Sequence, residues 1–266
     1  MTFKSYIKNL VNRLLNFSDI AIERQSLINR LKKSEGLIRN YGLLQHITSK
    51  KNKLKYLENL SFSRSQIRQD LFVLNELNYK KNGFFIEFGA ADGLHNSNTH
   101  ILEHIFDWEG LIAEPANIYH DSLIKNRKCI IEKKCIWINS NEKILFNQAK
   151  SPVLSTIERF SSSDHHRNLR KNGESYLVET LSLNDFLIKY NAPNVVDYLS
   201  IDTEGSEYAI LENFNFNKYK FRIITVEHNY TKNRQKIFDL LTNNGYLRKY
   251  EELSMFDDWY VLRNDI

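Results

Sequence analysis

The segment at residues 84–93, Phe-Phe-Ile-Glu-Phe-Gly-Ala-Ala-Asp-Gly, limits the possible folds of this chain more than any other. A short apolar run is followed by an acid and then by two glycines, Gly89 and Gly93. Such an apolar run is typical of a buried strand, and the glycines permit a tight turn that brings backbone amides close to a ligand. The pattern predicts a parallel strand that leads into a ligand-binding turn.

A second acid, Glu114, follows the next apolar strand segment at residues 111–113. A strand, a glycine turn, a helix and a second strand ending in an acid form the general signature of an adenosine-binding α/β half. At that position Glu114 is suited to bind the two ribose hydroxyls, and the alternative is a salt-bridged surface acid. The glycine spacing differs from Gly-x-Gly-x-x-Gly, so a site for a dinucleotide pyrophosphate is less favoured.

Strand and helix patterns alternate along the rest of the chain, which predicts a mostly parallel sheet with helices on both faces. The fold class expected is α/β: a Rossmann-like, seven-stranded sheet that ends in an antiparallel hairpin. The predicted strands are Phe84–Phe88, Leu111–Ala113, Cys129–Ile138, Val195–Ile201, Phe221–Val226, Tyr246–Tyr250 and Asp258–Leu262. Residues 147–177 are polar and are expected to be irregular, either as a functional lid or as a disordered loop.

The first 60 residues differ in charge from the remainder. They carry a net charge of +8, whereas residues 61–266 carry −3. Apolar residues at helical spacing among the lysines and arginines predict a basic helical extension, residues 1–60, ahead of the main domain at 61–266. The extension is expected to pack on that domain; contact with another subunit or with a membrane surface are the alternatives. The mildly acidic main domain argues against a nucleic-acid partner.

Composition indicates a soluble protein of the cytoplasm. No run approaches the roughly 18 apolar residues of a membrane span, and the N-terminus lacks the apolar core of a secretory signal. The chain has two cysteines, Cys129 and Cys135, whose spacing matches no zinc motif. Buried thiols in a reducing compartment are the favoured interpretation, although a disulfide between them is feasible in principle.

Two further strands end in acids. Asp202 directly follows the apolar strand at residues 195–201, with Glu204 two positions later, and Glu227 and His228 follow the strand at 221–226. Ligands bind at the carboxyl ends of strands in open α/β sheets. If these strands are neighbours, Asp202, Glu227 and His228 converge. Two carboxylates and an imidazole could hold Mg²⁺, Mn²⁺ or Fe²⁺; alternatively, Glu227 and His228 bind substrate or structural groups without a metal.

Together these segments resemble the FkbM family of S-adenosylmethionine-dependent methyltransferases. The resemblance covers roughly residues 64–263, and the basic extension lies outside it. The matching stretches are Phe85-Ile86-Glu87-Phe88-Gly89-Ala90-Ala91-Asp92-Gly93, Ser97-Asn98-Thr99, Leu102-Glu103, Trp108-Glu109-Gly110-Leu111-Ile112-Ala113-Glu114-Pro115, Tyr198-Leu199-Ser200-Ile201-Asp202-Thr203-Glu204-Gly205-Ser206-Glu207 and Val226-Glu227.

The resemblance implies a methyltransferase fold that binds S-adenosylmethionine. Glu114 would bind the ribose, and the other cofactor residues would be Glu87, Gly89, Ala90, Asp92, Gly93 and Asn98. The set Asp202, Glu227 and His228 also looks like the metal site of macrolide-sugar O-methyltransferases. Because His228 stands where that pattern has a second carboxylate, Fe²⁺ or Mn²⁺ would be preferred to Mg²⁺. The implied catalytic residues are Asp202, Glu204 and His228, with Glu204 as candidate base.

The function predicted is transfer of a methyl group to a hydroxyl of a sugar, either nucleotide-activated or part of a glycan such as a surface polysaccharide. The divalent metal would assist this O-methylation. One alternative acceptor is a lipid-linked or polyketide hydroxyl. A second alternative is a non-catalytic, cofactor-binding partner protein that associates through residues 1–60. A peripheral membrane contact or a homo-oligomer would also use that extension.

Overall fold

The computed structural model describes residues 35–263, which fall into two units divided between His46 and Ile47. In the first unit, residues 35–46 are helical. The helices expected over residues 3–34 lie outside the described residues. Of the described residues, none belongs to a helix long and apolar enough to cross a membrane.

The second unit begins with part of the basic segment. Helix α3 (Lys50–Asn59) is capped by Ser49, whose hydroxyl accepts a hydrogen bond from the Asn52 amide at 3.3 Å. Tyr56 on this helix is buried, and the Tyr79 hydroxyl donates to the Asn52 carbonyl oxygen at 3.2 Å. Residues 50–59 are therefore anchored in the second unit. A domain boundary at residue 60 stays a prediction.

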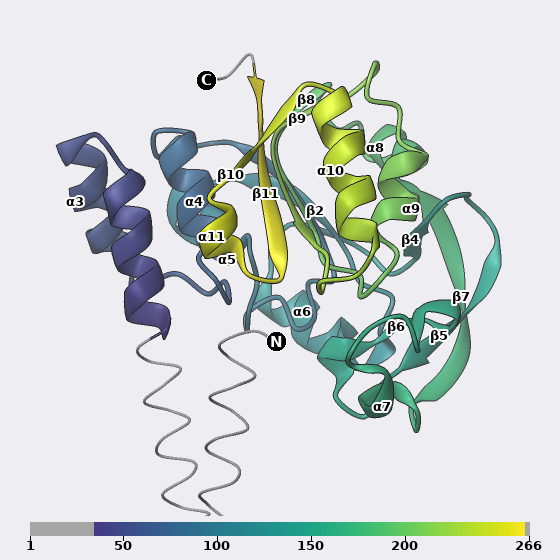
Figure 1. The fold of residues 1–266 in the computed structure, drawn as a ribbon. Helices are drawn as coiled ribbons and strands as arrows, with labels where there is room; N and C mark the ends of the chain where they lie inside the picture. The colour runs from purple at the N-terminus through teal and green to yellow at the C-terminus, as the bar shows by residue number, and fades with distance from the viewer. Residues whose placement is uncertain (1–34, 264–266) are drawn as a thin grey trace, which may run out of the picture. The chain divides into compact units, whose positions relative to one another are not determined.

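A seven-stranded sheet forms the centre of the second unit, in the order β10-β11-β9-β8-β1-β2-β3 (Figure 1). All pairs are parallel except those of β11, which runs antiparallel to both β9 and β10. The strands are β1 (Phe84–Phe88), β2 (Glu109–Ala113), β3 (Ile130–Glu132), β8 (Val195–Ile201), β9 (Lys220–Glu227), β10 (Tyr246–Lys249) and β11 (Asp257–Leu262). The expected fold class is confirmed.

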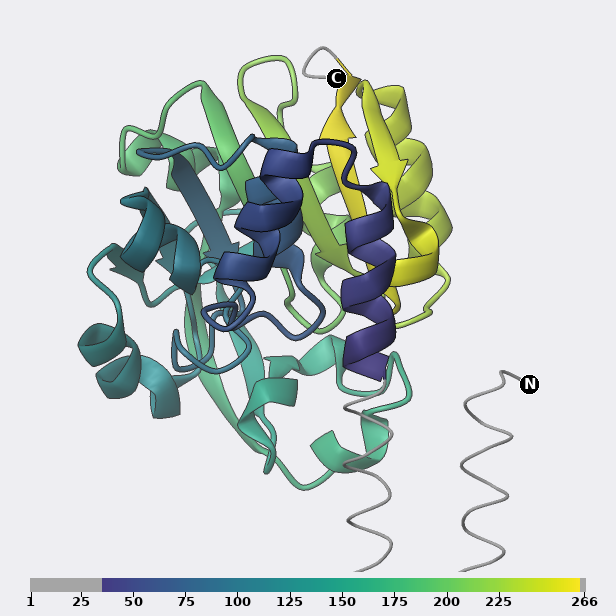
Figure 2. The same ribbon diagram turned by 90° about the vertical axis from the view of Figure 1, so that its left-hand side faces the viewer.

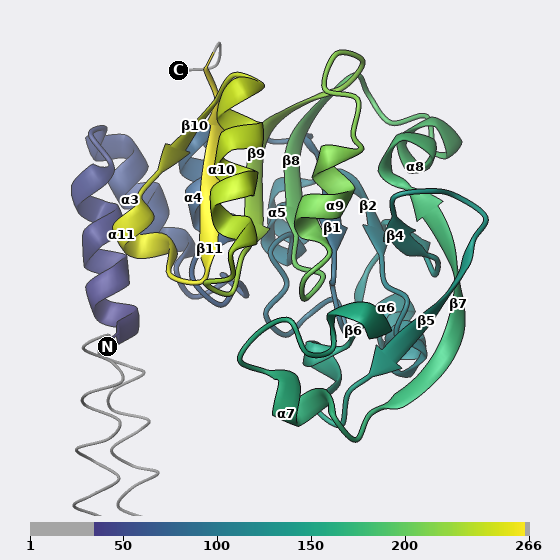
Figure 3. The same cartoon turned by 45° about the vertical axis from the view of Figure 1, so that its right-hand side comes forward.

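Helices cover both faces of this sheet, as its almost uninterrupted apolar strands require. One face carries α4 (Gln69–Glu76) and α5 (His100–Phe106), and Figure 2 looks onto it. The opposite face carries α8 (Leu183–Lys189), α9 (Glu207–Glu212) and α10 (Asn233–Asn243), seen in Figure 3. Short helices α6 (His120–Asn126) and α11 (Glu251–Ser254) follow β2 and β10.

Aromatic contacts join both helical layers to the sheet. Phe72 of α4 stacks on Trp259 of β11 with ring centroids 4.7 Å apart. On the other face, Phe186 of α8 meets Phe88 of β1 edge-on at 5.6 Å. All four side chains are almost completely buried. Burial of such large apolar groups stabilises the unit by about 1.5–3 kcal/mol for each side chain.

A second sheet, in the order β4-β7-β5-β6, was not expected from the sequence. Its strands are β4 (Cys135–Trp137), β5 (Lys143–Gln148), β6 (Thr156–Ile157) and β7 (Glu174–Ser182). In Figure 3, β5, β6 and α7 (Arg167–Arg170) lie below the large sheet, on the side toward which the parallel strands run, whereas β4 lies beside it. Trp137 and Ile157 pack against Ala116, which follows β2, in one apolar cluster.

Two expectations are corrected here. The single strand predicted over Cys129–Ile138 is wrong, because β3 and β4 belong to different sheets. The chain turns after Glu132, whose carboxylate accepts from the Lys134 amide at 3.1 Å and from Tyr190 at 2.9 Å. Residues 147–177 are also more regular than expected, because they contain β6, α7 and two short 3₁₀ turns between the paired ends of β5 and β7. Both cysteines are free thiols, and Cys135 is buried.

A histidine pair on α5 leads to a prediction about acid stability. The rings of His100 and His104 stack with centroids 4.0 Å apart, and burial, followed by repulsion from His104, lowers the pKa of His100 to about 4. Between pH 6.5 and 4 the unfolded chain binds a proton that the folded chain does not, so the free energy of unfolding falls as the pH falls. Because His100 is partly exposed, we expect the native protein to lose about 1–2 kcal/mol more stability from pH 7 to pH 5 than His100→Gln.

Urea unfolding at the two pH values measures this difference. Asn168→Gln, at an exposed position outside α5 that carries no titratable group, is the control and should keep the pH dependence of the native protein. Equal pH slopes for His100→Gln and the native protein would contradict the prediction.

Candidate functional site

The turn after β1 lies directly against the end of β8. Gly89 has a φ of +76°, and a Cβ built on it would lie only 1.7 Å from the backbone oxygen of Asp202. The Asp202 amide in turn donates to the Phe88 carbonyl oxygen at 3.2 Å. Any side chain at position 89 would therefore collide with rigid backbone, so the turn needs glycine both for conformation and for space.

Glu87, the acid in the segment at residues 84–93, is buried and hydrogen-bonded to other residues of the protein. Its carboxylate accepts hydrogen bonds from the Asn98 amide at 2.7 Å, from the Thr99 hydroxyl at 2.5 Å and from the Ser97 hydroxyl at 3.0 Å. The buried guanidinium of Arg127 lies 3.3 Å from the same carboxylate. Glu87 thus fixes the 97–99 segment beside the turn, which is how it can shape a cofactor site.

Asn98 places an unsatisfied acceptor next to this turn. Its side chain is buried and donates from Nδ2 to the Ser200 hydroxyl at 2.9 Å. Within the described residues, nothing donates a hydrogen bond to its buried Oδ1. A buried acceptor without a partner costs about 1–3 kcal/mol, so this atom is suited to receive a donor from a ligand.

Glu114 lies at the end of β2 with both oxygens directed to the backbone. It accepts from the Ala91 amide at 2.9 Å and from the Ala116 amide at 2.8 Å. Burial, opposed by these two hydrogen bonds, raises the pKa of Glu114 to about 7. Glu114 therefore connects the end of β2 to the turn after β1, and the remaining lone pairs of its carboxylate can accept hydroxyl donors.

The other cofactor candidates shape the turn itself. Ala90 is buried, and its carbonyl oxygen accepts from the Gly93 amide at 2.8 Å. Asp92 accepts from the amides of Leu94 and His95 at 2.9 and 2.8 Å. Although partial burial acts in the opposite direction, hydrogen bonds from His95 and the two amides lower the pKa of Asp92. Asp92 thus stabilises the exit of the turn.

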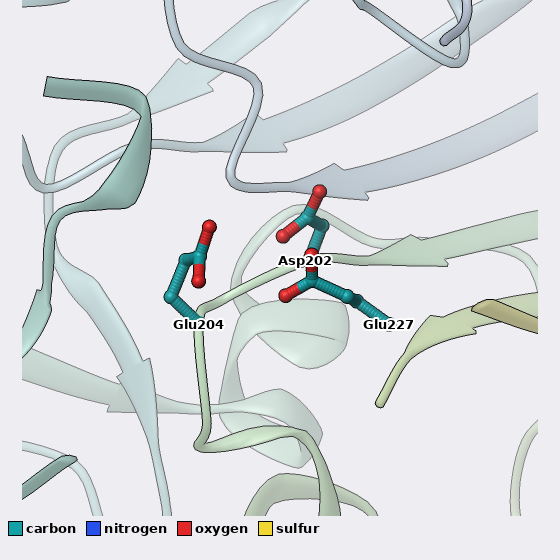
Figure 4. Close-up of side chains that lie close together, drawn as sticks. All are labelled: Asp202, Glu204 and Glu227. Atoms are coloured by element: carbon teal, nitrogen blue, oxygen red, sulfur yellow. The ribbon is translucent and has the colours of Figure 1, made fainter. Parts of the chain in front are cut away.

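Three carboxyl groups meet at the ends of β8 and β9. One oxygen from each of Asp202, Glu204 and Glu227 lies within 4.8 Å of the others, and the side chains face one another in Figure 4. We call these three residues the acid group. Asp202 is partly exposed, whereas Glu204 and Glu227 are buried. No other group of residues in the described chain meets the same geometric requirement for a metal site.

The pKa of each carboxyl group in the acid group is raised, so each one binds a proton more readily than a free carboxyl. Burial is the largest cause of the raised pKa of each one. Repulsion adds to it: Glu207 acts on Asp202, and Asp202 acts on both Glu204 and Glu227. Arg170 supplies one positive charge, at Glu204, and three carboxylates this close need more than one to be ionised together, so the group fits a divalent cation.

Glu204 is held in a strained backbone conformation. Its φ is +60°, in the left-handed region that non-glycine residues seldom adopt. Its carboxylate accepts from Arg170 at 2.5 Å and from the Asn229 amide group at 3.2 Å. Glu207 supports the loop by accepting from the amides of Thr203 and Gly205 at 2.9 and 3.0 Å. Strain that the surrounding contacts maintain is common at functional sites.

His228 lies outside the acid group. Its Nδ1 accepts from the Tyr230 amide at 3.0 Å, and its Nε2 lies 3.7 Å from a carboxylate oxygen of Asp258. Burial lowers the pKa of His228 to about 4, although Asp258 acts in the opposite direction. The structure thus brings Glu204, rather than His228, together with Asp202 and Glu227. The pairing of β11 with β9 places Asp258 beside His228, which directly follows β9.

Sequence reasoning missed two arginines. Arg127 and Arg170 are both completely buried at their side chains and bind Glu87 and Glu204, respectively. No signal in the sequence distinguishes them from the other 35 lysines and arginines of the chain. The sequence places Asn229 directly after Glu227 and His228. It does not predict the hydrogen bond from Asn229 to Glu204, because that bond depends on how two separate loops meet.

The strand order, the antiparallel β11 and the glycine turn at the carboxyl end of β1 are those of a Rossmann-like methyltransferase fold. A family model described as a methyltransferase FkbM domain matches residues 87–260. The chain belongs to this FkbM family of methyltransferases, as the resemblance in its sequence predicted.

Solved structures also match most of this chain, at low sequence identity. A precorrin-6y C5,15-methyltransferase from Geobacter metallireducens is 11% identical, with 72% of this chain and 85% of that chain covered and a TM-score of 0.37. A TehB-like S-adenosylmethionine-dependent methyltransferase from Corynebacterium glutamicum is 7% identical, with 79% of this chain and 94% of that chain covered and a TM-score of 0.35. A mutant of MtNAS in complex with S-adenosylmethionine is 11% identical, with 94% of this chain and 81% of that chain covered and a TM-score of 0.34. No match was found among the curated proteins.

Proposed function

We propose that this methyltransferase transfers the methyl group of S-adenosylmethionine to a sugar hydroxyl, on a nucleotide-activated sugar or a glycan. The position of Asp202 carries the proposal. Its backbone touches Gly89 in the proposed cofactor turn, and its side chain belongs to the acid group. A hydroxyl bound at the acid group therefore lies beside the methyl donor. Catalysis is then mainly the alignment of these two reactants.

The cofactor residues have separate tasks in this proposal. Glu114 accepts hydrogen bonds from the two ribose hydroxyls. Asn98 accepts one from the ammonium of the methionine part, because its buried Oδ1 has no donor within the described residues. Glu87 holds Asn98 in place through the Asn98 amide. Gly89, Ala90, Asp92 and Gly93 form the turn that contacts the cofactor.

The acid group binds the acceptor and a divalent cation. Asp202, which is the partly exposed member, contacts the acceptor hydroxyl and takes its proton. Glu204 and Glu227 complete the cation site. A divalent cation bound there would lower the pKa of the acceptor hydroxyl. Because all three donors are carboxylates, we expect Mg²⁺ or Mn²⁺; the preference for Fe²⁺ depended on His228.

Incubation with a labelled methyl donor and a panel of nucleotide sugars and glycans, followed by mass spectrometry of the products, tests the function. A sugar carrying one added methyl group supports the proposal. Lipid-linked and polyketide acceptors form a second arm of the panel. Methylation confined to that second arm would contradict a sugar acceptor while leaving the methyltransferase assignment intact.

The metal part has its own test. Enzyme stripped of metal and assayed in excess chelator should lose turnover, and added Mg²⁺ or Mn²⁺ should restore it. Full activity under chelation would refute the cation site but would leave the sugar acceptor unaffected.

Glu114→Gln is expected to weaken S-adenosylmethionine binding by about 10- to 100-fold, because hydrogen bonds to a charged group contribute about 1.5–3 kcal/mol. Titration calorimetry measures this change. The control is Glu109→Gln, an exposed acid at the opposite end of the same strand, which should bind the cofactor like the native protein. Equal affinities for both variants would remove Glu114 from the cofactor site.

A further inference from the structure

The segment that connects β5 to β7 covers the loop that carries the acid group. We call residues 149–173 the covering segment; it contains β6, α7 and the short turns Pro152–Leu154 and Glu158–Phe160. The Thr156 hydroxyl donates to the Glu204 carbonyl oxygen at 2.9 Å. The side chains of Phe160 and Ser163 pack so closely on Gly205 that a Cβ there would lie 3.1 Å from each. The covering segment is therefore in direct contact with the turn at residues 203–205.

Arg170 provides a third contact, at the end of α7. Its guanidinium binds both oxygens of Asp164, at 2.9 and 3.0 Å, and donates from Nε to the Leu154 carbonyl oxygen at 2.7 Å. The second N–H of Nη2 donates to the Glu204 carboxylate at 2.5 Å. One side chain thus joins two points of the covering segment to the acid group.

The Arg170 guanidinium and its two carboxylate partners are buried. The side chains of Arg170, Asp164 and Glu204 are 0%, 2% and 7% exposed. Arg170 is the cation that Asp164 of the covering segment and Glu204 of the acid group share, so a change at Arg170 leaves both buried carboxylates without a positive charge, which is strongly unfavourable. The planar fork of arginine satisfies two carboxyl groups and a carbonyl at once, which a lysine ammonium cannot match in geometry.

We propose that Arg170 is a positioning residue that fixes Glu204 in the acid group and holds the covering segment over the acceptor side of the site. The segment closes the site through the Arg170–Glu204 contact and opens to admit the acceptor. Only the location of the acceptor rests on the proposed function; the contact itself does not.

A double-mutant cycle with limited proteolysis tests the contact. Arg170→Gln, Glu204→Gln and the double variant are digested with chymotrypsin, and cleavage after Phe160 and Leu169 is followed by mass spectrometry. We expect each single variant to be cleaved at least about tenfold faster than the native protein, and the double variant no faster than Arg170→Gln. Arg167→Gln, an exposed arginine on the same helix, is the control and should be cleaved at the native rate.

Ligand binding and kinetics separate positioning from general destabilisation. S-adenosylmethionine should bind Arg170→Gln within about twofold of the native affinity, while the KM for the acceptor rises at least about tenfold. Arg170→Lys should not restore the native values. Native cleavage rates in Glu204→Gln, or strictly additive effects in the cycle, would overturn the proposal. If the panel yields no acceptor, the proposed function fails, whereas the cleavage rates still decide the role of Arg170.

Discussion

Asp202→Asn is expected to reduce methyl transfer by at least about a thousandfold while leaving S-adenosylmethionine affinity within about threefold of the native value. The carboxylate is the proposed base and cation ligand, and an amide can serve as neither. Asparagine has the same shape, so the backbone contacts of residue 202 with Phe88 and Gly89 should persist. Turnover of a labelled methyl donor and calorimetry with the cofactor measure the two quantities.

The stability of this variant separates chemistry from folding. Burial and repulsion from Glu207 raise the pKa of Asp202, so its ionised form is unfavourable in the folded state. Removing the charge should leave the melting temperature unchanged or raise it at neutral pH. Asp239→Asn, an exposed acid on α10, should behave like the native protein in both assays. Turnover above about a tenth of the native rate would exclude Asp202 as an essential group.

Gly89→Ala is expected to destabilise the second unit by about 4 kcal/mol or more, which lowers the melting temperature by about 10 °C in a unit of this size. Two costs add together. Alanine is strained at a φ of +76°, and its Cβ would lie 1.7 Å from the Asp202 backbone oxygen. Because the turn after β1 must then move, we also expect loss of detectable cofactor binding.

Gly36→Ala supplies the contrast. Position 36 is helical, and an added Cβ there meets no atom within 4 Å. Alanine in a helix is about 0.5–1 kcal/mol more favourable than glycine, so this variant should be as stable as the native protein or slightly more stable. Thermal unfolding of both variants, with calorimetry for the cofactor, completes the comparison. A native melting temperature for Gly89→Ala would show that the turn adapts.

Much of the large sheet could be predicted from local sequence. The predicted strand at residues 195–201 agrees with β8, and the predicted strand at 221–226 is extended by only one residue at each end in β9. Short apolar runs that end in acids or glycines mark such buried strands clearly. The small sheet was missed because its strands are short or half exposed: Leu177 of β7 and Leu145 of β5 both face solvent. The sequence pattern of β5 and β7 therefore resembles that of a polar loop.

The site was predicted in part. Asp202 and Glu227 end neighbouring parallel strands, so their approach followed from strand order once β8 and β9 were expected to pair. Strand order did not predict that Glu204 is the third member of the acid group. Choosing between Glu204 and His228 required knowing that Glu204 adopts a left-handed backbone and that His228 faces Asp258. Both depend on packing between segments far apart in the chain.

The sequence alone determined the family, the cofactor class and the parallel core, because glycine turns and acids at strand ends are local features with a fixed spacing. Only the tertiary structure decided which carboxyls meet and what holds them. Arg170 is 34 residues before Glu204, and Arg127 is 40 residues after Glu87. Such buried ion pairs form only when separate segments are brought together, since the desolvation of each charge must be offset by a partner that local sequence does not specify.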